Sequence, residues 1–199
     1  MDTAEMHNSK PVYKVKVLLY LILAAALGVL IYILLHETGH MIVMLSVGAK
    51  IESFSIFTAH VTASGGNYSE MSELWLHMNG AVLPIMCTYV YAMLYKKESK
   101  NLFYIFMSYI IALIPIGSLF AWVFVPFVYL DGSAPAADDM TKFLDIFSKE
   151  YSPLIVSAVA VLFIVIGIFI MIRKKILYNF FIVLKDLGGR RDAACYEIQ

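Results

Sequence analysis

Long apolar segments without a single charged residue constrain the fold of this chain more than any other feature. Val17–Leu35 runs for 19 residues and Asn101–Leu130 for 30 residues without a charge, and about 20 such residues in a helix cross a bilayer core. The residues AVILMFWYC make up 61% of the chain and charged residues 15%, against about 45–50% and 25% in soluble domains. A chain of 199 residues is too short to bury that excess in a soluble core. The sequence therefore predicts an integral membrane protein and disfavours a soluble enzyme, a disordered chain or a nucleic-acid binder.

The order of apolar and polar segments predicts an all-α integral membrane protein with about four transmembrane helices. The residues between Lys50 and Ser64 are rich in β-branched, aromatic and hydroxyl types, which indicates a short β-strand or hairpin after the first span. The third span is long for one crossing, so a tilt, a kink at Pro115 or a re-entrant end is expected. Short helices are expected at 139–149 and, lying at the membrane interface, at 176–184. The expected spans cover about 17–47, 73–95, 101–130 and 153–172.

The basic residues divide unevenly between the two sides that a four-span topology creates. Twelve of the 15 Lys and Arg residues fall in the N-terminal segment, the loop after the second span and the C-terminal tail. Because positive charge accumulates in cytoplasmic loops, this predicts a multi-pass protein, of the cell membrane, with both termini in the cytoplasm. We accordingly divide the chain into a cytoplasmic N-terminal segment (1–16), a membrane-embedded core (17–172) and a basic C-terminal tail (173–199).

The end of the first span carries the motif His36-Glu37-Thr38-Gly39-His40, which has the pattern HExxH. Residues four apart share one face of a helix, so both imidazoles can bind one metal ion, for which Zn²⁺ is the best candidate. In the chemistry that this spacing implies, Glu37 acts as general base on a zinc-bound water and then protonates the leaving amine. The alternative is a polar cluster at the end of a helix without a metal.

Two histidines leave a zinc ion short of a protein ligand. The depth of the motif, about 30 Å along the helix from Lys16, places it near the membrane side opposite the N-terminus. The loop 131–139 lies on that same side in the four-span arrangement. Candidates for the third ligand are Asp131, Asp138, Asp139, His60 and His77.

The motif HETGH at the end of the first span, the β-like segment after it and the later Asp-containing motifs resemble the site-2 protease family of intramembrane zinc metallopeptidases. In that family an Asp at the start of a late helix completes the metal site. Leu130-Asp131-Gly132 matches the family's LDG motif, whereas Asp138-Asp139 opens a helix, as in small family members. The resemblance implies Asp139 as third ligand, then Asp138, then Asp131, although any of them is also a common helix cap. The chain lacks the Asn-x-x-Pro that precedes LDG in many relatives.

His77 and Asn79, in the second span, lie near the same membrane side as His40. They are candidates for binding substrate or stabilising an oxyanion, and the alternative is a hydrogen bond between helices. The strand at 50–64 is a candidate for binding an extended substrate by strand addition, or else a structural hairpin.

The function expected is a membrane-embedded zinc metalloendopeptidase that hydrolyses peptide bonds of a membrane protein, peptide or membrane-associated substrate, with the lipid bilayer as its surroundings and no nucleic-acid partner. One alternative is a non-catalytic zinc-binding scaffold, a pseudoprotease. Another is a small ion or proton transporter, in which Glu37, His77 and Asp139 titrate.

Overall fold

The computed structural model describes the backbone of residues 3–187 and the side chains of residues 13–186. The chain is mostly helical, with one two-stranded sheet, which confirms the helical architecture and the β-segment expected from the sequence. Its elements are α1 (Thr3–Ser46), β1 (Ala49–Ser55), β2 (His60–Gly65), α2 (Glu70–Met93), α3 (Leu102–Leu130), α4 (Asp139–Phe147), α5 (Pro153–Arg173) and α6 (Ile176–Leu187).

Three of the described helices are long and apolar enough to cross a membrane: α1 from Tyr13 to Ser46, α3 and α5. The length and apolar composition of these helices indicate a membrane protein. The helix α2 has 24 residues, which is long enough to cross, but it is less apolar because polar residues such as His77 and Asn79 interrupt it. The structure thus has three clear span candidates where the sequence predicts about four.

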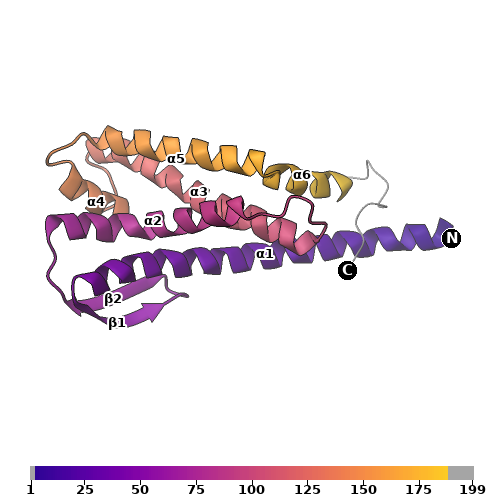
Figure 1. The fold of residues 1–199 in the computed structure, drawn as a ribbon, viewed down its shortest axis with the longest axis horizontal. Coiled ribbons are helices and arrows are strands. Elements are labelled where there is room, and N and C mark those ends of the chain that lie inside the picture. The colour runs from indigo at the N-terminus through magenta and orange to yellow at the C-terminus, as the bar shows by residue number, and fades with distance from the viewer. Residues whose placement is uncertain (1–2, 188–199) are drawn as a thin grey trace.

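The long helices α1, α2, α3 and α5 lie side by side along the long axis of the molecule, each running opposite to the one before it (Figure 1). Helix α3 packs against both α1 and α5, and α2 packs along α1. The hairpin and α4 lie at the end of the molecule where α1 finishes (Figure 1). One apolar core lies between α2, α3 and α5 around Ala112, Ile116 and Ile164, and another joins α1, α3 and α6 around Phe106 and Phe180.

The segment after α1 forms an antiparallel hairpin in which Ala49 pairs with Gly65 and Ser55 with His60. A bulge between Ile51 and Ser53 interrupts the register. Burial still alternates along β1, as expected for a strand with one face on the protein and one face outside. Of the two forms expected for this segment, a strand or a hairpin, the structure shows the hairpin.

Helix α3 is one continuous helix, with Pro115 and Pro126 inside it, so the described structure contains no separate re-entrant piece between residues 101 and 130. Helix α1 is longer than the expected span, because it already begins at Thr3. The expected short helices are present as α4 and α6. Helix α6 continues the direction of α5 in Figure 1 and buries Phe180 and Val183 against α1 and α3.

Candidate metal centre

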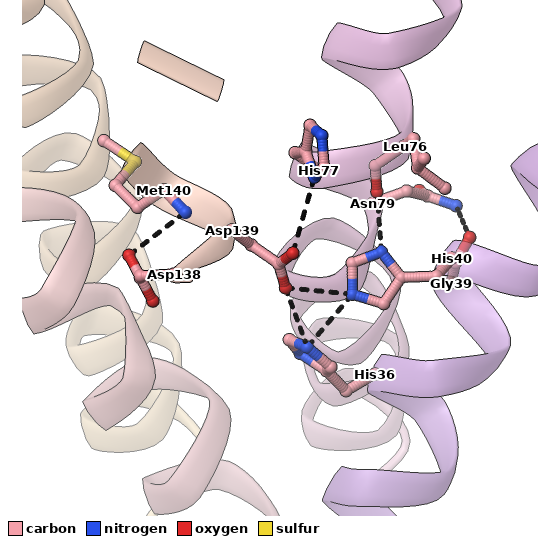
Figure 2. Close-up of polar contacts among 9 residues, drawn as sticks. All are labelled: His36, Gly39, His40, Leu76, His77, Asn79, Asp138, Asp139 and Met140. Atoms are coloured by element: carbon pink, nitrogen blue, oxygen red, sulfur yellow. Dashed lines mark hydrogen bonds and ion pairs between the residues drawn. The ribbon is translucent and has the colours of Figure 1, made fainter. Parts of the chain in front are cut away.

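The HExxH motif lies in the last three turns of α1, which remains helical up to Ser46. The chain leaves the helix at Gly48, whose positive φ of 82° suits a helix end. The spacing of four residues brings the His36 and His40 rings to a centroid distance of 4.8 Å. Their Nε2 atoms are 3.1 Å apart and face the same point in space (Figure 2).

Asp139, the first residue of α4, reaches the two imidazoles from a distant part of the sequence. Its Oδ2 atom is 3.4 Å from His36 Nε2 and 3.1 Å from His40 Nε2. The three residues form a group whose ligand atoms all lie within 4.8 Å of one another. The structure therefore brings together the three residues that the sequence analysis placed first as metal ligands.

Of the other candidates for the third ligand, His77 contacts Asp139 and three lie elsewhere. Asp138 is the N-cap of α4, and its carboxylate accepts a hydrogen bond from the backbone N–H of Met140 at 3.1 Å, away from the imidazoles (Figure 2). Asp131 is an exposed residue at the C-terminal end of α3. His60 is exposed on β2 and contacts hydroxyl groups of the hairpin.

The hydrogen bond of His40 to α2 decides which of its ring nitrogens is free. His40 Nδ1 lies 2.7 Å from the carbonyl oxygen of Leu76, and because a carbonyl only accepts, Nδ1 carries the proton and donates it. In the neutral ring, Nε2 then presents a lone pair toward Asp139. A backbone carbonyl on the outer nitrogen is a usual partner of a metal-binding histidine.

Asp139 is the anionic member of the group. Burial raises the pKa of its carboxyl, but the imidazoles of His36, His40 and His77 outweigh burial and hold this pKa well below its usual range. The carboxylate is therefore ionised at neutral pH and offers only lone pairs. His40 Nε2 lies 3.1 Å from this carboxylate, so both atoms can contact one cation.

The distances within the group fit a zinc ion. Tetrahedral zinc bound at about 2.0–2.1 Å from each ligand atom places those atoms roughly 3.3 Å from one another. The three separations here are 3.1, 3.1 and 3.4 Å. Two histidines and one carboxylate are also a ligand set of catalytic zinc sites, in which the fourth position stays open.

Glu37 is 5% exposed and follows the first ligand directly on α1. Within the described part of the chain it makes no hydrogen bond or ion pair. An ionisable side chain that is retained in an apolar, membrane-spanning helix is a candidate functional group.

Helix α2 supports the group from one side. Asn79, a candidate for binding substrate, donates a hydrogen bond from Nδ2 to the carbonyl oxygen of Gly39 at 2.7 Å, so it joins the two helices. His77, the other candidate, places Nδ1 3.4 Å from Asp139 Oδ1. A Cβ atom on Gly80 would lie 2.5 Å from His40 Nε2, so this glycine makes room for the imidazoles.

The sequence analysis did not identify the Leu76 carbonyl or the space at Gly80 as parts of the site. A backbone acceptor leaves no signal in residue type, and a glycine in a transmembrane helix is common for packing reasons alone. The one sequence feature that pointed to Gly80 was its position directly after Asn79, a candidate site residue. Comparisons with protein-family models, curated proteins and solved structures find no match to this chain.

Proposed function

We propose that the chain is a membrane-embedded zinc metalloendopeptidase of the site-2 protease type. The observation that carries this proposal is the meeting of His36 Nε2, His40 Nε2 and Asp139 Oδ2 with the buried Glu37 next to the first ligand. A metal-binding scaffold has no need of a buried carboxylate at that position. A transport path has no need of two histidines on one helical turn.

In this proposal His36, His40 and Asp139 hold the ion, and Glu37 moves the protons. When bound, Zn²⁺ supplies a Lewis acid that acidifies water and polarises a peptide carbonyl. Glu37 accepts the proton of the attacking water as the C–O bond forms, and donates it to the amine nitrogen as the C–N bond breaks. The Leu76 carbonyl keeps the proton of His40 on Nδ1, which leaves Nε2 for the metal.

The substrates in this proposal are membrane or membrane-associated proteins and peptides. The site lies on a helix that is apolar enough to cross the bilayer, so a substrate arrives through or along the membrane. A helical substrate has its backbone hydrogen-bonded internally and has to unwind before cleavage. The hairpin packs against α1 and is a two-stranded sheet, so an extended substrate segment adds to an outer edge by backbone hydrogen bonds.

We further propose four membrane crossings, with both termini on the cytoplasmic side of the cell membrane. Helices α1 and α3 run in the same direction along the molecule (Figure 1), so the chain returns across the molecule between them. Helix α2 lies between α1 and α3 in the sequence and runs antiparallel to α1 over a length of 24 residues. Its polar residues His77 and Asn79 face partners on α4 and α1, which spares them from contact with lipid.

The test uses Glu37→Gln, which removes the base and keeps the shape of the side chain. We expect the purified variant to retain one zinc ion per chain, measured by mass spectrometry of the metal. We also expect new N-termini in the membrane proteome of cells that express the wild type, and none in cells that express Glu37→Gln. The control Glu52→Gln makes the same change at an exposed position on β1. We expect it to retain both the bound zinc and the new N-termini.

Two results would contradict the proposal. Cleavage that persists in Glu37→Gln would exclude Glu37 as the base and with it this mechanism. A wild-type protein with stoichiometric zinc and no new N-termini would favour the non-catalytic scaffold.

A further inference from the structure

We propose that His77 is a positioning residue that orients the Asp139 carboxylate toward the metal, an inference that rests on the proposed function. The two oxygens of Asp139 have different neighbours (Figure 2). Oδ2 faces His36 and His40, whereas Oδ1 lies 3.4 Å from His77 Nδ1. His77 thus contacts the Asp139 oxygen that His36 and His40 do not contact.

Asp139 needs such a partner because the packing of α4 positions its backbone but does not fix the rotation of its carboxylate. Helix α4 has only nine residues, and the Asp139 side chain is 31% exposed. A carboxylate rotates readily about its Cβ–Cγ bond, since terminal torsions of this kind have broad minima. A donor to Oδ1 selects the rotation that turns Oδ2 toward His36 and His40.

His77 is well placed for this role because it belongs to a long, packed element. Its side chain is 18% exposed, and it lies on α2, which packs against α1, α3 and α4. The neighbouring Leu76 carbonyl accepts the hydrogen bond of His40 at 2.7 Å. Two successive residues of α2 therefore contact two candidate ligands that come from two different elements.

The contact also sets the proton arrangement of His77. An ionised carboxylate only accepts hydrogen bonds, so Nδ1 of His77 is the donor. Among the described residues, His77 is the one that contacts Oδ1. A substrate would therefore have to displace Asp139 in order to bind this nitrogen, which favours positioning over substrate binding as the role of His77.

The experiment measures zinc affinity by competition with a chromophoric chelator, on purified full-length protein in detergent. Groups that orient a metal ligand typically contribute 10–100-fold to metal affinity. We expect His77→Ala to weaken zinc binding by a factor in that range, and to change the visible absorption spectrum of the Co²⁺-substituted protein. His77→Asn keeps an N–H donor near the position of Nδ1 and restores most of the affinity. The control His60→Ala removes an exposed histidine of the hairpin and leaves affinity and spectrum unchanged.

The outcomes separate this inference from the proposed function. Wild-type affinity and an unchanged Co²⁺ spectrum in His77→Ala would overturn the positioning role and leave the peptidase proposal standing. Equal loss of affinity in His77→Ala and His77→Asn would also overturn it, because the shape of the ring and not its donor would then matter. A wild-type protein that binds no zinc would overturn the proposed function itself.

Discussion

Gly80 leaves the space in which the imidazoles of His36 and His40 meet. A Cβ atom at this position would lie 2.5 Å from His40 Nε2 and 2.8 Å from His36 Cε1, well inside van der Waals contact. The backbone of α2 therefore lies so close to the two imidazoles that only glycine fits at this position without a shift of its neighbours. Close approach between helices through glycine is a common device in membranes, and here it also shapes a site.

We predict that Gly80→Ala disrupts the centre, because the added methyl group displaces the ring of His40. Zinc content of the purified variant should fall well below one ion per chain. Gly117→Ala is the matched control, since it changes a glycine of α3 whose added Cβ would meet nothing within 4 Å. Full zinc content in Gly80→Ala would show that α1 and α2 shift apart easily at this point.

Single substitutions also test which aspartate is the third metal ligand. We predict that Asp139→Ala loses zinc binding, because two histidines remain as the only protein ligands of the proposed set. Asp131→Ala should keep it, because Asp131 is exposed at the end of α3. Metal content of the two purified variants, compared with wild type, checks this prediction, and loss of zinc in Asp131→Ala would place the ligand in the LDG sequence instead.

At the scale of elements, α4 is a short amphipathic helix whose packing brings the backbone of Asp139 close to the HExxH helix. Its apolar residues Met140, Phe143 and Leu144 are buried, and they hold one face against α2 and α3. Asp138 caps the first turn by accepting the N–H of Met140. Because Asp139 is the first helical residue, the cap and the proposed metal ligand are adjacent.

We predict that Asp138→Ala weakens zinc binding without abolishing it. Loss of an N-cap costs about 1 kcal/mol of helix stability, so the first turn of α4 opens more often and Asp139 leaves the imidazoles. The melting temperature and the zinc dissociation constant report the two effects. Asp138→Asn keeps a capping oxygen and should resemble wild type. A complete loss of zinc in both variants would indicate that Asp138 itself binds the metal.

At the scale of the whole molecule, the antiparallel order of α1, α2, α3 and α5 determines which loops lie at the same end of the molecule (Figure 1). The loop between α2 and α3 and the loop between α3 and α4 lie at opposite ends of α3. If the long helices cross the membrane, these loops lie on opposite sides of it.

Cysteine labelling of intact cells tests this topology in a background with Cys87→Ser and Cys195→Ser. A membrane-impermeant maleimide should label Ser133→Cys, because this exposed position follows α3 on the side opposite the basic residues. Glu98→Cys, exposed in the loop before α3, should be labelled only after lysis. The reversed pattern would place the termini outside the cytoplasm.

Local patterns in the sequence account for the membrane-spanning character, the HExxH helix and the two short helices. Hydropathy and the spacing of residues along a helix act between near neighbours, so they can be read from a single chain. The hairpin followed from residue type in the same way. The continuity of α3 did not, because proline inside an apolar helix is compatible with a kink, a break or neither.

Only the tertiary structure decided which aspartate joins the histidines and what α2 contributes. The sequence placed Asp139 before Asp138 and Asp131 only through a resemblance to a family, because each of the three lies near a helix end, where aspartate also serves as a cap. Packing of α4 on α2 and α3 selects Asp139. On α2, close to Gly80, the Leu76 carbonyl contacts His40 and His77 contacts Asp139. Such contacts depend on how distant helices pack in three dimensions, which no local periodicity encodes.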